Sequence, residues 1–345
     1  MNIHFPPSLV AGDLIAITAP SSGVPAYLHP RLDLAINHLR LRGYRVLEGK
    51  CLRAQYKNKS ADKHARAEEL MSFLCNPEIK AVMPPWGGDL GMELLELLDF
   101  ERLAVQAPKW FIGFSDLSTF HFPLSLRSGW ATVHGPNLME LGAGNLDLTT
   151  RALWDIVESP RGNQVTQHAS SAYQVEENQW GVATDAGFNL TQPTQWKMLN
   201  NETECVAFSG RLIGGCLDII SRLAGTEWGN LPPFIHQCGN DGVILYFENV
   251  EMGPCELTRA LYSLRLHGWL TSLNGILIGR NAGPDADNST QQNYLDALHS
   301  ALGGLNIPVI YDVDIGHIPP QMSLVNGALA TVTYRHHRGS ITQQL

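Results

Sequence analysis

The sequence predicts an α/β protein in which parallel strands alternate with helices, and three observations carry this prediction. Short apolar runs alternate with stretches whose apolar residues recur at helical spacing. The runs lack a polar face, as in strands that are buried on both sides. Such alternation indicates a parallel sheet with helices on both faces, and it returns in the second half of the chain. We therefore expect two α/β domains in these 345 residues.

The first expected strand is the apolar run 13–19, which ends in the turn sequence Pro20-Ser21-Ser22-Gly23. Helical spacing follows, and Gly43 is a typical residue just past a helix end. The expected elements, in order, are a helix at 32–39, a strand at 44–47, a helix at 67–74, a strand at 79–83, a helix at 92–98, a strand at 109–114 and a helix from 117. This order predicts a parallel sheet in the first half.

The pattern loosens over residues 143–206, where polar residues surround two tryptophans. Because long irregular stretches inside compact proteins usually have a role, we interpret this stretch as a connector that carries a functional loop. Later expected elements are a helix opened by 210–215 and continuing through Leu223, strands at 243–247, 275–278 and 307–311, and helices at 256–267 and 291–302. We expect domains at 1–165 and 207–345, joined by a connector at 166–206.

Composition and charge exclude several function classes. With 44% hydrophobic and 17% charged residues, the chain resembles an ordinary globular protein. A net charge of -9 and the absence of any Lys or Arg run argue against nucleic acid as a partner. No apolar window approaches the roughly 18 residues needed to span a bilayer, so we expect no membrane span. The start of the chain shows no secretory signal, which predicts a cytoplasmic protein.

The sequence gives no indication of a metal or cofactor. Its six cysteines form no C-x-x-C pair and lie in or beside apolar segments, which is typical of buried thiols in a reducing compartment. Neither the G-x-G-x-x-G dinucleotide pattern nor the phosphate-binding loop G-x-x-x-x-G-K-[ST] occurs. We therefore expect neither a zinc site nor a bound cofactor.

Candidate catalytic residues fall where predicted strands end. The pair Gly87-Gly88 follows the strand at 79–83, and Ser115 follows the strand at 109–114. Glu248 and His317 follow the later strands 243–247 and 307–311. Ligands of parallel α/β sheets gather outside the carboxyl ends of the strands. A serine, a histidine and a carboxylate at these ends form a possible nucleophile, base and orienting group.

Ser115 is the sharpest of these signals. It lies in Gly113-Phe114-Ser115-Asp116-Leu117, which predicts a strand, a sharp turn and the start of a helix. This is the setting in which a nucleophilic serine is held exposed, although Leu117 replaces the last glycine of G-x-S-x-G. Taken alone, however, the pentapeptide is more typical of a serine or aspartate that caps a helix N-terminus.

The other candidates also have structural alternatives. Gly87 would let a substrate approach the backbone and Gly88 could donate an N–H to an oxyanion, but a glycine pair after a strand is also a common turn. Glu248 ends a strongly apolar strand, where a carboxylate is costly unless it is paired. It could instead be solvated, with Glu251 as the nearby competitor. A loop histidine such as His317 is often only a surface residue.

Trp180 is a large aromatic residue in a polar segment without core periodicity. It could stack on a flat group of a substrate, or it could pack the loop onto the domain. For Trp196, packing is the preferred interpretation.

Eight spaced motifs give the chain a family resemblance. In order along the chain they are Ala11-Gly12-Asp13 with Ala19-Pro20-Ser21-Ser22, Gly87-Gly88, Pro108-Lys109 with Gly113-Phe114-Ser115-Asp116, His134-Gly135-Pro136, Gly214-Gly215, Gly225-Thr226, Phe247-Glu248 and Gly316-His317. In this set and order, the sequence resembles the LD-carboxypeptidases and their microcin-immunity relatives over almost its whole length.

The resemblance implies a fold and a set of roles. It places the family nucleophile on Ser115, the glutamate on Glu248 and the histidine on His317, with oxyanion donors on the backbones of Gly88 and Asp116. It implies an N-terminal Rossmann-like, flavodoxin-like domain and a C-terminal domain of swivelling β/α type. The triad would form across the cleft between them. Homodimers are common in the family.

Chain length and the long segment before Gly210 are more similar to the microcin C immunity branch than to the shorter muropeptide enzymes. Trp180 matches the branch tryptophan that stacks on the adenine of a toxic aminoacyl nucleotide. Cys216 departs from the asparagine usual after Gly-Gly, and Asn249 replaces an aspartate that often follows the catalytic glutamate. The first departure bears on substrate contacts and the second on local hydrogen bonds.

Three functional hypotheses follow from this resemblance. The preferred one is a serine peptidase or amidase with a Ser-His-Glu triad that cuts a small peptide-like substrate, specifically a microcin C-type aminoacyl-nucleotide conjugate. The second is a muramoyltetrapeptide LD-carboxypeptidase of cell-wall recycling. The third, of another class, is a catalytically silent binding protein for such ligands.

Overall fold

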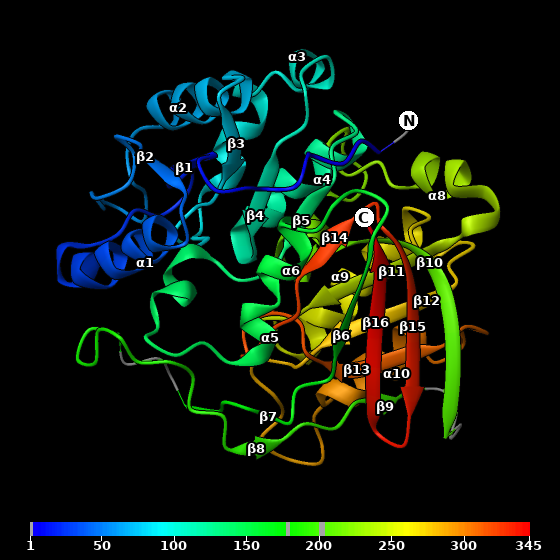
Figure 1. The fold of residues 1–345 in the computed structure, drawn as a ribbon. Helices are drawn as coiled ribbons and strands as arrows, with labels where there is room; N and C mark the ends of the chain where they lie inside the picture. The colour runs from blue at the N-terminus through cyan, green and yellow to red at the C-terminus, as the bar shows by residue number, and fades with distance from the viewer. Residues whose placement is uncertain (1–2, 177–179, 200–203) are drawn as a thin grey trace.

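The first half of the chain builds a six-stranded sheet in which five strands run parallel (Figure 1). The computed structural model describes residues 3–176, 180–199 and 204–345. Along the sheet the strands are β14 (Leu324–Asn326), β5 (Thr132–His134), β4 (Trp110–Gly113), β3 (Ile79–Val82), β1 (Leu14–Ile17) and β2 (Arg45–Glu48). Every residue of β1 and β4 is buried, as expected for strands with helices on both sides.

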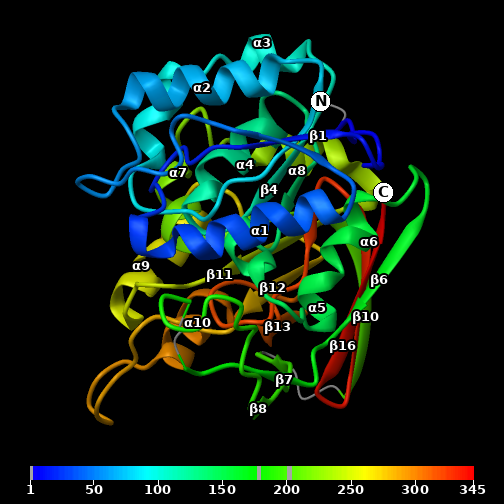
Figure 2. The ribbon, with the colours of Figure 1, turned by 60° about the vertical axis from the view of Figure 1, so that its left-hand side comes forward.

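Helices cover both faces of this first sheet. One face packs against α2 (Lys63–Cys75), η2 (Gly91–Leu97), α3 (Phe100–Ala104) and α4 (Ser118–Leu126). The other packs against α1 (His29–Leu41), η4 (Leu138–Gly142) and α6 (Leu153–Val157). The shorter elements of this half are η1 (Ala26–Leu28), η3 (Ser115–Leu117) and α5 (Leu148–Arg151). Figure 2 shows α1 and α2 on opposite sides of β1.

The second half builds an eight-stranded mixed sheet. Its strands, in spatial order, are β6 (Gln164–His168), β16 (Arg338–Gln344), β15 (Leu329–Arg335), β10 (Cys205–Cys216), β11 (Val243–Glu248), β12 (Gly275–Gly279), β13 (Val309–Val313) and β9 (Lys197–Met198). The central four, β10 to β13, are parallel. At the two sides, β15 pairs antiparallel with β10 and β9 with β13, and β16 and β6 continue the sheet beyond β15 as antiparallel strands. The parallel strands therefore end at one common edge of the sheet.

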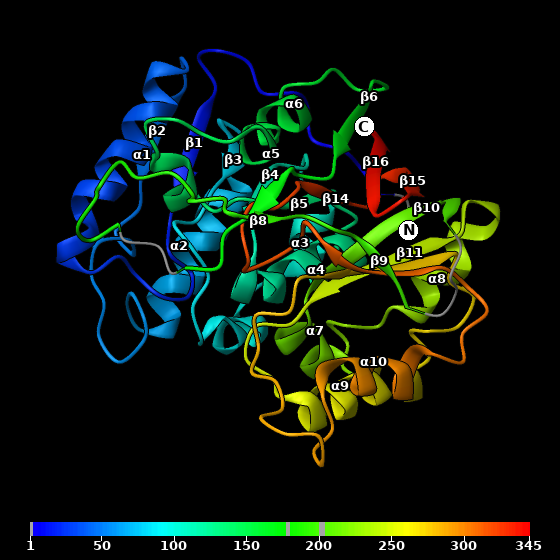
Figure 3. The same cartoon turned by 90° about the horizontal axis from the view of Figure 1, so that it is seen from below.

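One face of the second sheet is covered by helices (Figure 3). They are α7 (Leu217–Leu223), α8 (Pro232–Cys238), α9 (Pro254–Leu266) and α10 (Tyr294–Leu302), with η5 (Gly239–Asp241) after α8. A separate two-stranded ribbon joins β7 (Ala172–Tyr173) to β8 (Gln192–Pro193). The two-domain α/β architecture predicted from the sequence is confirmed.

The chain crosses between the two sheets more than once. β14 comes from the C-terminal part of the chain, yet it pairs with β5 of the first sheet. β6 comes directly after the first half, yet it pairs with β16 of the second sheet. The predicted boundary between residues 165 and 166 lies inside β6, and residues 177–179 and 200–203 of the predicted connector lie outside the described residues. The division at 165 and 206 stays a prediction.

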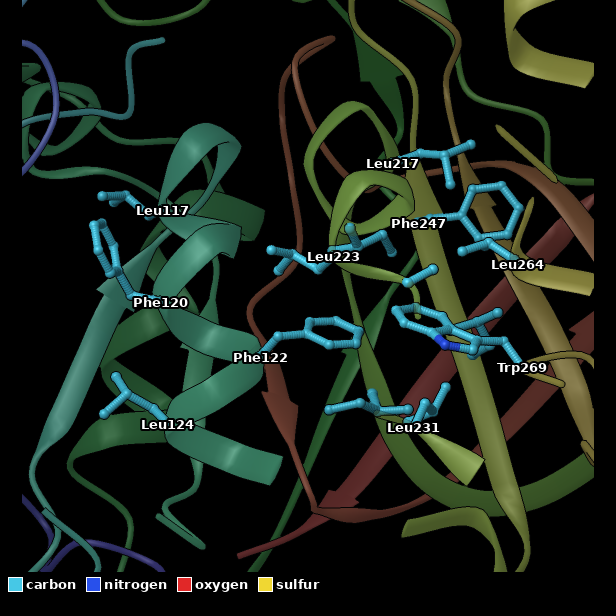
Figure 4. Packing of buried hydrophobic residues seen from close by; sticks show 14 of the residues in the cluster. Leu117, Phe120, Phe122, Leu124, Leu217, Leu223, Leu231, Phe247, Leu264 and Trp269 are labelled. Atoms are coloured by element: carbon cyan, nitrogen blue, oxygen red, sulfur yellow. The ribbon is translucent and has the colours of Figure 1, made fainter. Parts of the chain in front are cut away.

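A shared hydrophobic core joins the two sheets (Figure 4). Helix α4 of the first half directs Phe122 toward the second half, where its ring stacks on Trp269, in the turn after α9, at a centroid distance of 5.1 Å and an interplanar angle of 7°. Offset-stacked aromatic pairs add to the stabilisation from burial alone. Because α4 begins three residues after Ser115, this contact links the segment that follows that serine to the second half of the chain.

Three details of the predicted secondary structure were wrong. Residues predicted as a helix at 92–98 lie mostly in the 3-10 helix η2, which ends at Leu97 and whose first N–H, that of Gly91, donates to the Asp116 carboxylate. Residues 210–215 end the long strand β10 and do not open a helix. Their glycines allow close strand packing, since a Cβ on Gly214 would lie 1.9 Å from the Tyr246 carbonyl oxygen. The stretch 143–206 also contains short helices and strands, from α5 to the start of β10.

Over the described residues, every helix is too short or too polar to cross a membrane.

Candidate active site

Ser115 occupies a sharp turn between β4 and the helices that follow it. Its φ is +68°, a left-handed conformation that is uncommon for a residue with a side chain. Phe114 donates its N–H to the Asn137 side-chain oxygen at 3.1 Å, which holds the backbone on one side of the turn. Gly113 is needed because a Cβ there would lie 2.4 Å from Leu117. Strained turns of this kind present a serine at the edge of a sheet.

His317 links the serine to a carboxylate. Its Nε2 lies 2.9 Å from the Ser115 Oγ, and its Nδ1 lies 2.8 Å from Glu248 Oε2. With Nδ1–H donating to the carboxylate, Nε2 is free to accept the serine proton. The Phe114 ring packs edge-on against the imidazole at a centroid distance of 4.8 Å. The three predicted residues therefore form one hydrogen-bonded series.

The two sheets supply different members of this series. Ser115 follows β4 of the first sheet, and Glu248 ends β11 of the second. His317 lies on the segment that leaves β13 of the second sheet and enters β14 of the first. The histidine thus lies where the chain passes from one sheet to the other.

Glu248 is completely buried, and glycines make room for it. Gly316 has a φ of +90°, and a Cβ there would lie 2.2 Å from the Glu248 Cγ. A Cβ on Gly279 would lie 2.7 Å from the Glu248 Cβ. The glycine before His317 therefore lets the histidine segment pass closely over the carboxylate.

The pKa of His317 reflects two opposing effects. Burial lowers the pKa, because the charged imidazolium loses solvation. The Glu248 carboxylate raises it by its charge and by its hydrogen bond. The net pKa lies above the ordinary value of 6.5, which makes the imidazole a stronger base.

The predicted oxyanion residues lie beside the serine. A Cβ on Gly87 would lie 2.7 Å from the Asp116 nitrogen and 2.9 Å from the Ser115 Oγ, so only a glycine fits there. Gly88 has a φ of +137°, and a Cβ there would lie 2.3 Å from the Ser22 Oγ. Gly88 and Asp116 line the same cavity as Ser115.

The Asp116 side chain ties this loop to the serine turn. Buried beneath the site, its carboxylate accepts hydrogen bonds from Ser21 Oγ at 2.5 Å, Gly91 N at 2.7 Å and Thr119 Oγ1 at 3.2 Å. Burial raises the pKa of Asp116, while these bonds oppose the increase. Ser21 also accepts from Leu90 N at 3.1 Å. The side chain is therefore structural, and its backbone N–H remains the group of catalytic interest.

A cavity of about 500 Å³ opens over these groups. Its lining includes Arg222 and Asp218 of α7, which sequence reasoning missed. Both Asp218 oxygens accept backbone N–H groups, from Val250 and Glu251 at 3.0 Å each. The exposed Arg222 donates its Nε to the Asp218 carbonyl at 2.9 Å. α7 starts where β10 ends, so the signal that could have identified these two residues was their position just after a strand end.

The two departures from the family pattern have different surroundings. Cys216 is buried in the cavity wall, and burial together with the nearby Glu248 raises the pKa of its thiol well above the usual value. It is therefore a poor nucleophile at neutral pH. The Asn249 amide donates to the Met252 carbonyl at 2.8 Å and to Asn281 Oδ1 at 2.7 Å. Asn249 stabilises the turn after Glu248.

Trp180 lies apart from this cavity and contacts Arg31, whose guanidinium carbon is 4.7 Å from the centre of the indole ring. Arg31 also donates to the carbonyls of Thr184 and Ala186, at 2.9 Å each. The segment around Trp180 is thus held against the first half of the chain. Stacking of Trp180 on a substrate stays a prediction, whereas Trp196 is fully buried and bonded to Asp314.

In the described part of the chain, no three His, Cys, Asp or Glu side chains are placed to hold a metal ion together. The fold and the site define a class: a two-domain α/β protein in which a serine, a histidine and a glutamate are hydrogen-bonded in series where the two sheets approach each other.

Comparison with protein families assigns the chain more closely. The model of the LD-carboxypeptidase N-terminal domain matches residues 15–135, and that of the LD-carboxypeptidase C-terminal domain matches residues 209–332. The chain belongs to the LD-carboxypeptidase family, which confirms the resemblance in its motifs. It is accordingly an enzyme of the serine-type carboxypeptidase class.

Relatives of two kinds align with almost the whole chain. The microcin C7 self-immunity protein MccF of Escherichia coli is 24% identical, covering 97% of this chain and 95% of that protein. The murein tetrapeptide carboxypeptidase of Pseudomonas aeruginosa is 26% identical, covering 88% and 87%. The solved structure of wild-type MccF in the apo state shares the fold, with a TM-score of 0.83 at 24% identity over 98% of both chains.

Proposed function

We propose that the protein hydrolyses an amide bond of a small peptide-like substrate with Ser115 as nucleophile, His317 as general base and Glu248 as the group that orients the histidine. The observation that carries this proposal is the series of hydrogen bonds at 2.9 and 2.8 Å that joins the three side chains. The arrangement is that of nucleophile, base and orienting carboxylate in serine hydrolases.

The geometry supports an acyl-enzyme route. The Ser115 oxygen attacks the carbonyl carbon while its proton moves to His317 Nε2. The imidazolium, stabilised by Glu248, then donates that proton to the leaving nitrogen, and the amide bond breaks. A water molecule next gives a proton to His317 and attacks the serine ester, which releases the acid and restores Ser115.

The developing oxyanion needs donors that are already in position. We assign this role to the backbone N–H groups of Gly88 and Asp116, which line the cavity with Ser115. Gly87 lets the substrate carbonyl approach, because a side chain there would collide with the nucleophile. The bonds from Ser21 and Gly91 to the Asp116 carboxylate hold the two donor segments together.

The substrate we propose is an aminoacyl-nucleotide conjugate of the microcin C type, cleaved for self-immunity or detoxification. MccF is similar over nearly the full length of this chain, and solved structures describe MccF in complex with aspartyl sulfamoyl adenosine and a tryptophan-to-phenylalanine mutant of MccF in complex with adenosine monophosphate. The Arg222 guanidinium at the cavity could bind a substrate carboxylate through paired hydrogen bonds. Trp180 would stack on the base after leaving Arg31.

A muropeptide is the second candidate substrate. The murein tetrapeptide carboxypeptidase of Pseudomonas aeruginosa covers a similar share of this chain. A tetrapeptide also ends in a carboxylate, which Arg222 could bind in the same way. This substrate has no base, so it would give Trp180 no stacking partner.

Location and assembly are part of the proposal. The six cysteines are free, which fits a reducing compartment such as the cytoplasm. We also propose a homodimer, on the resemblance to the family alone, which a mass measurement by light scattering would test.

A cleavage screen tests the proposed function. The purified protein would be incubated with a muropeptide tetrapeptide and with an aspartyl-nucleotide amidate, and the products identified by mass spectrometry. We expect cleavage of the amidate by the wild type and none by Ser115→Ala. Cleavage of the muropeptide alone would assign the protein to cell-wall recycling, and no cleavage of either would favour the silent binding protein.

A further inference from the structure

Glu140 is a buried carboxylate that the proposed mechanism does not use. It lies in η4, a 3-10 helix in which every residue is buried. Burial raises the pKa of its carboxyl to about 7, because the ionised form loses solvation. A buried carboxylate is costly unless its oxygens accept hydrogen bonds. The groups that donate to Glu140 therefore show which segments this side chain stabilises.

The first donor connects Glu140 to the serine turn. Asn137 donates its backbone N–H to Glu140 Oε2 at 2.9 Å, and its side-chain oxygen accepts the Phe114 N–H at 3.1 Å. Phe114 directly precedes Ser115, and its ring packs against the His317 imidazole. Through Asn137, Glu140 thereby holds the backbone just before the nucleophile.

The second donor connects Glu140 to the histidine segment. Gln321 donates its Nε2 to the same oxygen, Glu140 Oε2, in a long hydrogen bond of 3.4 Å. Gln321 is buried and follows His317 on the segment that runs from β13 to β14. One carboxylate oxygen therefore joins the segment before Ser115 to the segment after His317.

A simple helix cap is the structural alternative for this glutamate. Glu140 and Asn137 form a capping box at the start of η4, in which each side chain bonds to the backbone of the other residue. The structure contains the same motif at the start of α10, where Asn293 and Asp296 are both exposed. A capping box therefore requires neither burial nor a donor from a distant segment. Glu140 has both, since Gln321 reaches it from the histidine segment.

We infer that Glu140 is a positioning residue of the proposed reaction, which keeps Ser115 Oγ and His317 Nε2 within hydrogen-bond distance by joining the segments that carry them. Glu140 does not line the catalytic cavity, so it acts through these segments and not on the substrate. A displacement of about 1 Å in a catalytic pair can cost about a hundred-fold in rate. The inference rests on the proposed function, because it assumes that Ser115 and His317 carry out the chemistry.

The test compares two exchanges at Glu140 with a matched exchange at the exposed capping box. Glu140→Leu removes the accepting oxygen, and kcat should fall by about ten-fold to a hundred-fold with little change in KM. Glu140→Gln keeps an oxygen that can accept both bonds, so its kcat should stay within about two-fold of the wild type. Asp296→Leu removes the corresponding side chain of α10 and should retain the wild-type kcat.

NMR of the imidazole nitrogens reports on the same geometry without a substrate. The His317 signals, assigned with His317→Gln, should shift in Glu140→Leu and stay in place in Glu140→Gln. If Glu140→Leu does not fold, Gln321→Met removes the donor on the histidine segment and takes its place. We expect that variant to shift the His317 signals and to lower kcat by about three-fold to ten-fold, the effect of one hydrogen bond.

A folded Glu140→Leu with the wild-type kcat and unshifted His317 signals would overturn the inference. Equal losses of kcat in Glu140→Leu and Glu140→Gln would also overturn it, because a loss that an accepting oxygen does not restore cannot come from these hydrogen bonds. A wild type that hydrolyses neither the amidate nor the muropeptide, in a protein whose His317 signals shift as expected, would contradict only the proposed function.

Discussion

The structure positions Ser115 and Glu248 in a different way from Trp180. Ser115 comes shortly after β4 and Glu248 ends β11, and every residue of these two strands is buried. The Trp180 segment lies between β7 and β8, which are two residues long each. Its position depends on Arg31, through the indole contact and two carbonyl hydrogen bonds.

This difference separates chemistry from recognition. Moving a strand end would break hydrogen bonds between strands and disrupt the packing of a buried core. Releasing the Trp180 segment would break only a few contacts. We therefore expect substitutions at the strand ends to lower kcat. Substitutions at the cavity rim and at Trp180 should act mainly on KM and on the choice of substrate.

The largest effect is expected for Ser115→Ala. Without the nucleophile, kcat should fall by about 10⁴-fold or more, because water cannot replace a positioned serine. The fold should be intact, which circular dichroism and the melting temperature would check. A variant that retained most of its activity would mean that another group attacks the substrate.

Glu248→Gln should come next, with a loss of about 10³-fold to 10⁴-fold in kcat, since the amide cannot stabilise the imidazolium.

The pH profile of the same variant gives a sharper readout. His317 must be neutral to accept a proton, so wild-type kcat/KM should fall as pH decreases through a pKa above 6.5. Without the carboxylate, burial dominates, and this acid limb should move to lower pH. An unchanged limb in the variant would assign the titration to another group.

A smaller effect is expected for Arg222→Gln. If the guanidinium binds a substrate carboxylate, kcat/KM should fall by about ten-fold to a hundred-fold, mainly through KM. Arg259→Gln, on the exposed side of α9, is the matched control and should behave as the wild type. A substrate whose carboxylate is replaced by an amide should be insensitive to Arg222→Gln. Equal losses on both substrates would place Arg222 outside substrate recognition.

An effect of similar size, but the most selective one, is expected for Trp180→Ala. Loss of base stacking would cost about 1–3 kcal/mol, or roughly ten-fold to a hundred-fold in kcat/KM on a nucleotide conjugate. Cleavage of a muropeptide should change much less. If both substrates lost the same factor, Trp180 would serve only to pack its segment against Arg31.

The sequence predicted the parts of the fold whose apolar pattern is local. Strands such as β1 and β11 were predicted from continuous apolar runs, and the candidates at strand ends followed from the rule that ligands gather there. Strand β10 was not recognised, because its glycines serve close packing against Tyr246 and resemble a loop. Strand β14 was also missed, since its partner β5 is nearly 200 residues away in sequence.

For the candidate site, the sequence predicted residue types but not their distances. His317 meets Ser115 only because its segment crosses from one sheet to the other, a long-range contact that no local pattern encodes. Arg222 was missed for the same reason, since it reaches the cavity from a helix with no distinctive motif. The contact of Trp180 with Arg31 joins segments about 150 residues apart.

The proposed mechanism requires above all that Ser115 is an activated nucleophile. The wild type, Ser115→Ala and Glu248→Gln would be treated with a serine-directed phosphonate, and the labelled residue located by peptide mass spectrometry. We expect one phosphonate on Ser115 of the wild type, none on Ser115→Ala and slow labelling of Glu248→Gln. An unlabelled wild type that still binds ligands would contradict the account and identify a silent binding protein, and labelling of Ser115→Ala at the wild-type rate would locate the nucleophile elsewhere.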